Sequence, residues 1–160
     1  MSILTIRKAN TEDCDLYFQW ANDPLVRLQS FDTATIDYHV HVEWFNERIN
    51  NPNFCFYIFH NEEHQSIGQV RITKSNYNIA IIGVSIDSMH RGNSYASQIL
   101  NTASNIFLTE NPNWFLYAYI KICNLTSIHS FIKANYIFEK ELTYQNEPSV
   151  LYIKTLKQCK

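Results

Sequence analysis

The stretch from Ile79 to Phe107 decides the fold, and it reads IAIIGVSIDSMHRGNSYASQILNTASNIF. Its first part, residues 79–86, is an apolar, β-branched run of strand length, which predicts a buried strand. From Ser94 onward, apolar residues recur three or four positions apart, which is the period of an amphipathic helix. The polar residues 87–93 between them predict a short turn. The unit is therefore a strand, a tight turn and a helix.

The start of this predicted helix has the chemistry of an anion site. The first turn of a helix leaves backbone N–H groups unpaired, and the helix dipole adds positive charge there. Arg91 contributes a fixed positive charge and a fork of donors. The small residues that would let a ligand approach the backbone are Gly92, Asn93, Ser94 and Ala96. The turn is thus a candidate cradle for a phosphate or pyrophosphate; an ordinary strand-to-helix connection is the alternative.

Composition bounds the remaining choices. The 160 residues suit a single domain, 1–160, and 46% of them are hydrophobic, as in ordinary globular proteins. A net charge of -2 without a basic stripe gives no reason to expect a nucleic-acid partner. No apolar run approaches the roughly 20 residues of a membrane helix, so no membrane association is predicted.

The four cysteines do not form a metal-binding pattern. Cys14, Cys55, Cys123 and Cys159 are widely spaced and include no C-x-x-C pair, so no metal site is predicted. The N-terminus lacks a basic segment followed by an apolar signal core. We therefore expect reduced thiols in a cytoplasmic protein.

Elsewhere the patterns predict alternating helices and strands. Further strands are expected at residues 3–7, 54–59, 66–73, 114–122, 136–142 and 149–156. Further helices are expected from a cap at Asn10 or Thr11 to Ala21, at 36–50 and at 124–134. Residues 26–35 look irregular, and the last two strands form a hairpin around 146–148. The order predicts a mixed α/β (α+β) fold of about seven mostly antiparallel strands and about four helices.

The residues Arg91-Gly92-Asn93-Ser94-Tyr95-Ala96 resemble the acyl-CoA signature of the GNAT family of N-acetyltransferases. That signature is Gln or Arg, two residues, Gly, one residue, then Gly or Ala, directly after a strand. Ser94 stands where the family usually has Gly. The element order is similar to the GNAT architecture along nearly the whole chain, which implies that the fourth strand splays away from the fifth.

A second motif lies at residues 124–136. Asn124, Ser127, Ile128 and Lys133 fit a pattern that many GNAT members carry before a helix exit. Phe131 replaces the Tyr that commonly protonates the departing CoA thiolate.

The N-terminal third resembles the RimJ/RimL-like branch of the family. The resemblance rests on residues 20–27, Ser30-Phe31 and residues 41–45, with 67–71 in addition. It is closest to the PseH-type enzymes, which acetylate the 4-amino group of a nucleotide-linked amino sugar.

The resemblance implies acetyl-CoA as co-substrate and a small-molecule amine as acceptor. The diphosphate would sit on the turn, and the pantetheine arm would run beside the fourth strand, with a backbone N–H near Ser85 or Ile86 facing the thioester carbonyl. The implied cofactor-binding residues are Val84, Ser85, Ile86, Arg91, Gly92, Asn93, Ser94, Tyr95, Ala96, Asn124 and Ser127.

The acceptor and catalytic residues are less closely defined by the sequence. His41, Glu43 and His90 are candidates for the base that accepts the amine proton, each with a surface role as the alternative. Asn124 of the second motif joins His41 and Glu43 in the catalytic set. Arg27, His41 and Tyr117 are the candidates for binding the acceptor.

Three other functions stay open at this point. One is a RimJ/RimL-like protein N-terminal acetyltransferase, the second a non-catalytic acyl-CoA-binding module, and the third a structural protein without a nucleotide ligand. The oligomeric state is also open, a homodimer included.

Overall fold

A single sheet runs through the protein, whose structure is a computed structural model that describes residues 2–156. Its strands are β1 (Thr5–Lys8), β2 (Phe54–His60), β3 (Ser66–Lys74), β4 (Ile79–Ile86), β5 (Phe115–Lys121), β6 (Ile137–Tyr144) and β7 (Glu147–Thr155). The seven strands lie in the order β1-β2-β3-β4-β5-β7-β6. Neighbours are antiparallel except β4 and β5, which are parallel. The predicted mixed, mostly antiparallel fold is confirmed.

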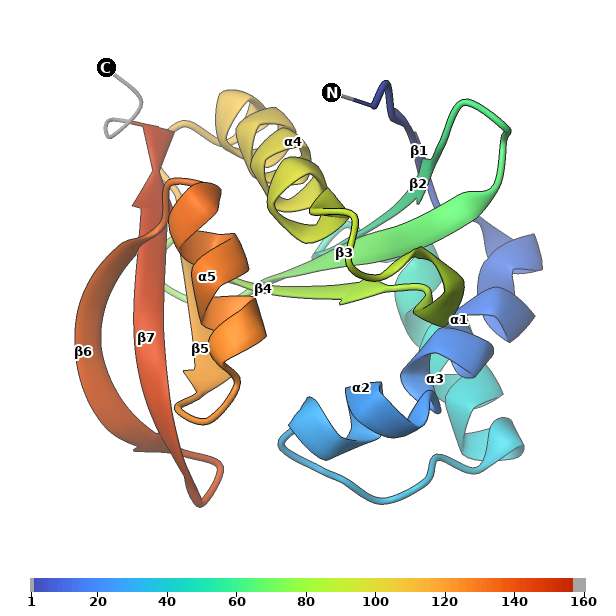
Figure 1. Ribbon diagram of the computed structural model, residues 1–160, viewed down its shortest axis with the longest axis horizontal. Coiled ribbons are helices and arrows are strands. Elements are labelled where there is room, and N and C mark those ends of the chain that lie inside the picture. Colours follow the sequence, from blue (N-terminus) through green and yellow to red (C-terminus); the bar gives the residue numbers. More distant parts are fainter. Residues whose placement is uncertain (1, 157–160) are drawn as a thin grey trace.

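Helices cover both faces of the sheet. They are α1 (Cys14–Ala21), α2 (Pro24–Gln29), α3 (Tyr38–Ile49), α4 (Tyr95–Glu110) and α5 (Leu125–Lys133), with short 3-10 turns η1 (Thr11–Asp13) and η2 (Ser88–His90). In Figure 1, α4 lies above β2–β4, whereas α1 and α3 lie below them. Helix α5 packs beside α4 and contacts β5.

Helix α2 corrects part of the prediction that residues 26–35 are irregular: residues 26–29 are helical, and only residues 30–35 lie outside helices and strands. Pro24 occupies the first turn of α2, and the Asp23 carboxylate accepts hydrogen bonds from the N–H groups of Leu25 (3.0 Å) and Val26 (3.2 Å). Proline is favourable in a first helical turn, where its missing N–H would have no partner. Pro24 therefore begins α2 three residues after α1 ends at Ala21, and the sequence pattern had not predicted a helix there.

The final hairpin also turns earlier than predicted. Gln145 and Asn146 both have positive φ angles, 46° and 65°, and Tyr144 pairs with Glu147 across them. Two residues of positive φ form the compact turn that suits antiparallel strands. Glu147 and Pro148 consequently belong to β7 and not to the turn.

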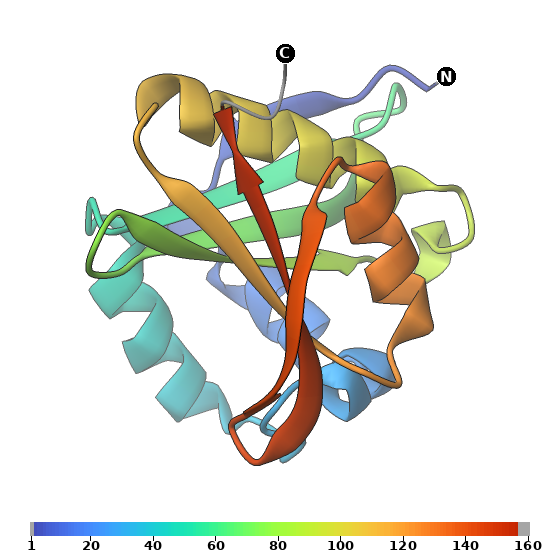
Figure 2. The same cartoon turned by 90° about the vertical axis from the view of Figure 1, so that its left-hand side faces the viewer.

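Strands β4 and β5 stay paired only at their beginnings. Their register runs from Ile79 opposite Phe115 to Ile81 opposite Tyr117, while β3 accompanies β4 as far as Ile86. We call the point after Ile81 and Tyr117 the fork, and Figures 1 and 2 show the two strands diverging from it. The predicted splay is confirmed.

Two separate cores hold the layers together. On the α4 face, Val70 and Ile72 of β3 are fully buried. On the opposite face, Phe56 and Ile58 of β2 pack against α1 and α3. Because successive side chains of a strand point to opposite faces, alternation places Gln69, Arg71 and Ser85 on this second face. We call it the α1/α3 face.

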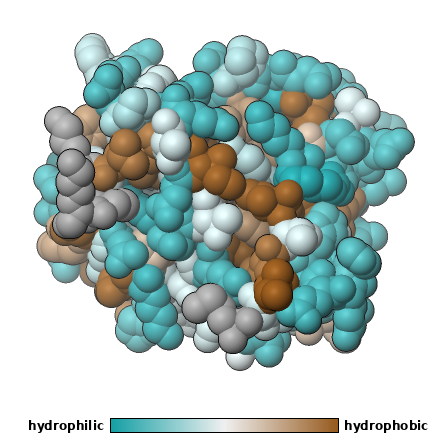
Figure 3. Space-filling model, turned by 90° about the horizontal axis from the view of Figure 1, so that it is seen from above, coloured by the Kyte–Doolittle hydropathy of each residue, from teal (hydrophilic) through white to brown (hydrophobic). Residues whose placement is uncertain are grey.

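The outer surface seen from above is mainly hydrophilic, with hydrophobic side chains gathered in a band across it (Figure 3). None of the helices within residues 2–156 has the length and apolar character needed to cross a bilayer.

Candidate active site

The turn before α4 leaves the start of that helix open. Ser94 is its N-cap residue and makes no side-chain capping hydrogen bond, and the first turn of α4 contains no acidic residue. The N–H groups of this turn therefore have no side-chain cap from α4 itself, and the positive end of the helix dipole lies beside them.

Two residues of the turn have left-handed backbone conformations. Gly92 has φ +80°, and Ser94 has φ 59° and ψ 20°. Glycine adopts this conformation without the steric cost that a Cβ atom brings. The geometry explains why a glycine is usual at the position of Ser94, and it shows that serine can hold the same shape.

A groove of about 340 Å³ opens between the start of α4 and the exposed side of α5. The residues predicted to bind the cofactor that line it are Ile86, Arg91, Gly92, Ser94, Tyr95 and Ala96. The groove thus brings the end of β4 and the helix start together, as a cradle for a diphosphate requires.

The far wall of the groove was missed by sequence reasoning. Thr126, His129, Ser130 and Lys133 supply it from α5, and His90 and Ser97 complete the lining. The four α5 residues are spaced three, one and three apart, so they form one stripe of a helix. A stripe of polar and basic residues opposite the motif was the available signal, because Lys133 and His129 add potential positive charge to an anion site.

Other predicted cofactor residues organise the site without lining the groove. The Asn124 side chain caps α5 by accepting a hydrogen bond from the Ser127 N–H at 3.2 Å. The Asn93 amide donates to the carbonyl oxygens of His90 (3.0 Å) and Arg91 (3.3 Å). These bonds fix the two ends of the groove.

The backbone of β4 offers free donors beyond the fork. The Asp87 N–H donates to the Ile67 oxygen at 2.9 Å. In an antiparallel ladder alternate residues point to the same neighbour, so the Ser85 N–H also points toward β3. The N–H groups of Val84 and Ile86 then point to the side from which β5 has diverged. Of the two donors predicted for the thioester carbonyl, Ile86 faces the gap and Ser85 does not.

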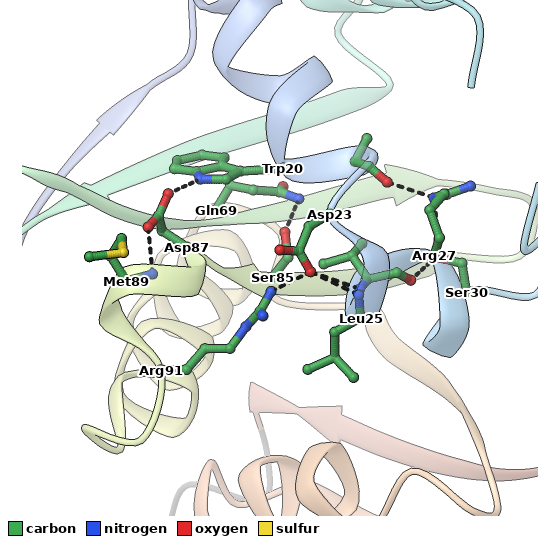
Figure 4. Close-up of polar contacts among 12 residues, drawn as sticks. Trp20, Asp23, Leu25, Arg27, Ser30, Gln69, Ser85, Asp87, Met89 and Arg91 are labelled. Carbon is green, nitrogen blue, oxygen red and sulfur yellow. Dashed lines mark hydrogen bonds and ion pairs between the residues drawn. The ribbon is translucent and has the colours of Figure 1, made fainter. Parts of the chain in front are cut away.

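Two contacts tie the turn before α4 to the helices α1 and α2 (Figure 4). Arg91 Nη2 forms an ion pair with Asp23 Oδ1 at 2.7 Å, and Trp20 Nε1 donates to Asp87 Oδ2 at 2.8 Å. Burial opposes the ionisation of Asp23, but the Arg91 guanidinium and the α2 N–H groups outweigh it and hold the pKa of Asp23 below its usual range. The carboxylate therefore stays charged and bridges the two segments.

Arg27 lies on α2, where its donors are engaged by the chain. Nε donates to the Ala21 oxygen at 2.6 Å, Nη1 to the oxygens of Asp32 (3.0 Å) and Ala34 (3.3 Å), and Nη2 to Ser30 Oγ (3.1 Å). The guanidinium thereby holds the loop after α2 against the end of α1, and its role in binding an acceptor stays a prediction.

His41 is buried between α1 and α3. Its Nε2 lies 2.9 Å from the Cys14 oxygen, and its ring packs against Phe18 (centroids 5.3 Å apart) and Trp44 (5.7 Å). Burial lowers the pKa of His41, so the imidazole is favoured in its neutral form. Glu43, on the same helix, is exposed. The two predicted base candidates therefore have opposite environments.

Tyrosines line β5 and β6 on the α1/α3 face. Tyr117 is adjacent to Tyr119, with ring centroids 6.3 Å apart, and Tyr119 stacks on Tyr144 at 3.9 Å. Phe31, from the loop after α2, meets Tyr144 edge-on at 4.8 Å. The sequence pattern placed Tyr117 and Tyr119 on one face of a strand, but it could not foresee that Tyr144 and Phe31 join them, since these two residues lie far away in the chain.

Phe131 points into the core under α5. It is 3% exposed and meets Tyr136 edge-on, with centroids 4.9 Å apart. Among residues 2–156, no cluster of three His, Cys, Asp or Glu side chains is arranged to hold a metal ion.

Comparison with known proteins agrees with this geometry. A family model, the Acetyltransferase (GNAT) domain, matches residues 4–135. The chain therefore belongs to the GNAT acetyltransferase family, and it is an acetyl-CoA-dependent N-acetyltransferase. A search of curated proteins gives no match.

Solved structures share the fold along the whole chain. A spermidine N-acetyltransferase from Vibrio cholerae, in complex with CoA and spermine, has a TM-score of 0.86 and 16% identity over 97% of this chain and 96% of that one. The aminoglycoside acetyltransferase AAC(6')-Ib, in complex with coenzyme A and kanamycin, has a TM-score of 0.83 and 14% identity over 98% and 96%.

Proposed function

We propose that this protein transfers the acetyl group of acetyl-CoA to the primary amine of a nucleotide-linked amino sugar. The observation that carries the acetyl-CoA part of the proposal is the continuity between the open start of α4 and the free edge of β4 beyond the fork. A diphosphate on the helix start would direct the pantetheine arm along Val84 and Ile86, with its thioester at the fork.

The chemistry then depends mainly on positioning. The thioester C–S bond breaks and an amide C–N bond forms, while the amine loses a proton and the CoA thiolate takes one up. Holding both reactants at the fork can supply roughly 7–11 kcal/mol of the barrier. A backbone N–H at Val84 or Ile86 would stabilise the oxyanion, and one such donor is worth about 3–4 kcal/mol.

The amine proton requires an acceptor, and His41 and Glu43 stay the proposed candidates. The neutral imidazole of His41 has the right protonation state, because burial lowers its pKa. With Nε2 donating to the Cys14 oxygen, only Nδ1 would be free to accept a proton. Phe131 has no proton to donate, so the thiolate, with a reference pKa of about 8.5, would leave unassisted or take its proton from water.

The tyrosine group supports an acceptor with a ring. Tyr117, Tyr119 and Tyr144 give the α1/α3 face beyond the fork flat surfaces with polar hydroxyls. Such residues suit sugars and nucleobases, which combine apolar faces with hydrogen-bonding edges. The structural neighbours bind spermine and kanamycin, so polyamines and aminoglycosides are the natural comparison substrates.

The deciding experiment is a thiol-release assay with acetyl-CoA and a panel of amines. The panel contains a uridine-diphosphate-linked amino sugar, the free amino sugar, a peptide with a free N-terminus, spermidine and kanamycin. We expect the nucleotide-linked sugar to give the highest kcat/KM. A peptide that surpasses it would establish the N-terminal acetyltransferase instead. Acetyl-CoA binding without turnover on any amine would leave an acyl-CoA-binding module.

We further propose that the protein works in the cytoplasm with reduced thiols, which is compatible with the free thiols of Cys14, Cys55 and Cys123. Cys159 lies outside the described residues. A homodimer is likewise proposed, and sedimentation at several protein concentrations tests it.

A further inference from the structure

Arg71 differs from every other arginine of the chain. Arg7 is held by Asp13, Arg91 by Asp23, Arg48 by Glu47 and a backbone oxygen, and Arg27 by three backbone oxygens and a hydroxyl. Arg71 has no hydrogen-bond or ion-pair partner among the described residues, and its Nε is a buried donor without an acceptor.

The surroundings of Arg71 do not compensate its charge. Its guanidinium lies over the Trp44 ring, 5.7 Å from the centroid, and Tyr17 and Arg27 are the ionisable groups that act on it. No carboxylate is among these groups, and Arg27 is a like charge. Buried charges in proteins are normally paired and hydrogen-bonded, because an unpaired one carries a desolvation penalty. An open guanidinium therefore points to a partner that the chain does not provide.

The position of Arg71 is the fork. Arg71 lies opposite Gly83 on β4, two residues beyond Ile81, the last β4 residue paired with β5. A Cβ atom on Gly83 would lie 3.9 Å from Arg71 Nη2, so the guanidinium reaches over the glycine. The next residue, Val84, is the first with a free backbone N–H beyond this point. Arg71 is partly exposed and so accessible from the α1/α3 face.

Gln69 supplies a second unsatisfied group beside it. Its Nε2 donates to Ser85 Oγ at 2.8 Å, while its Oε1 is buried without a partner (Figure 4). Gln69 and Arg71 are two residues apart on β3 and share one face. The Cα atoms of two such residues are roughly 7 Å apart, so an open acceptor and an open donor occupy neighbouring positions on this face. Together they are complementary to a molecule that carries both an N–H group and an anion.

We propose that Arg71 is an anion subsite for the acceptor, and hence that the acceptor carries a phosphate or carboxylate group close to its reacting amine. Gln69 Oε1 accepts a hydrogen bond from that amine. The role of the amine in this inference rests on the proposed acetyl transfer. The binding of an anion at Arg71 does not depend on it and can be measured separately.

The test measures binding and turnover with matched ligands. Calorimetric titrations in the presence of CoA compare glucosamine 6-phosphate with glucosamine, and an amino acid with its amide; the first pair probes phosphate and the second carboxylate. The variants are Arg71→Met and the control Arg48→Met. Both remove a guanidinium that lies over Trp44, but Arg48 already has its own partners.

We expect the anionic member of at least one pair to bind wild-type protein roughly 10- to 100-fold more tightly, as a charge-assisted hydrogen bond provides. Arg71→Met should abolish this preference, and Arg48→Met should keep it. Because Arg71→Met removes a charge without an ion-pair partner and a buried Nε donor without an acceptor, its melting temperature should be equal to or above that of the wild type.

Three outcomes separate this inference from the proposed function. Equal binding of anionic and neutral ligands by the wild type overturns the anion subsite, whatever the enzyme acetylates. A preference that survives in Arg71→Met overturns the assignment to Arg71. A preference lost in Arg71→Met, together with no acetyl transfer to any amine, upholds the subsite and rejects the proposed transfer.

Discussion

Replacing Ser94 by glutamate should weaken acetyl-CoA binding while leaving the fold intact or more stable. Ser94 is exposed, already left-handed, and caps α4 without using its side chain. A carboxylate there can interact with the free N–H groups of the first turn, which stabilises a helix by about 0.3–1 kcal/mol. For a chain of this length that raises the melting temperature by roughly 1–4 °C.

The same carboxylate would repel a diphosphate. Two unit charges about 5 Å apart interact by about 1 kcal/mol in bulk water and about 3 kcal/mol near a protein surface. The dissociation constant for acetyl-CoA should therefore rise by roughly 5- to 150-fold, and by less at high salt, because salt screens an exposed charge.

The control is Ser94→Gln, which has the same backbone strain and nearly the same size without the charge. Calorimetric titration with acetyl-CoA, at low and high salt, compares the two variants with the wild type. Gly92→Pro is unsuitable here, because Gly92 has φ +80° and proline requires a negative φ. Equal dissociation constants for the Glu and Gln variants would refute the placement of the diphosphate on α4.

Three other substitutions probe the rest of the site. Lys133→Gln should raise the dissociation constant of acetyl-CoA about two- to fivefold in the same titration, whereas Lys140→Gln on β6 should not change it. Asp23→Ala removes the α2 cap and an ion pair, so it should lower the free energy of unfolding by about 1–2 kcal/mol in urea denaturation. Asp23→Asn keeps the cap, and its free energy of unfolding should fall by less than about 1 kcal/mol. Burial lowers the pKa of His41 in the folded protein, so the unfolded chain takes up the proton first as the pH falls. At pH values under about 6.5 the free energy of unfolding should therefore decrease, by at most about 1.4 kcal/mol per pH unit from this residue. His41→Gln should reduce this pH dependence and leave the part due to His60, whose pKa is also lowered by burial. In the kinetic assay, a fall of kcat by about a hundredfold or more in the same variant would identify His41 as the base.

Local patterns predicted the strand, the turn and the helix beside the groove because these parts are neighbours in sequence. A strand, a turn of small residues and a helix follow one another within residues 79–107, and their geometry needs no distant contact to be recognised. The same reasoning failed at residues 26–29, which it took as irregular and which belong to the helix that begins at Pro24. It also missed the α5 wall, although the spacing of Thr126 and Lys133 was there to be read.

The acceptor side could not be predicted in the same way, because its properties depend on which groups are already engaged. Arg27 and Arg71 are both arginines near segments that resemble one branch of the family. The structure distinguishes them, since Arg27 donates hydrogen bonds to the end of α1 and to residues 30–34, whereas Arg71 donates none to a described residue. Such a difference arises from contacts between elements far apart in the chain, and no periodicity records it.

The polar groups at the fork that have no hydrogen-bond partner also indicate which kind of acceptor fits there. Two carboxylates that tie the turn before α4 to α1 and α2 are occupied: Asp23 binds Arg91 and the start of α2, and Asp87 binds Trp20 and the Met89 N–H. A polyamine acceptor would need free carboxylates to replace the water around its ammonium groups. Among the buried side-chain atoms of the described residues, Arg71 Nε and Gln69 Oε1 are left without a partner beside the fork. This arrangement favours an acceptor that brings its own negative charge, and it disfavours one that brings several positive charges.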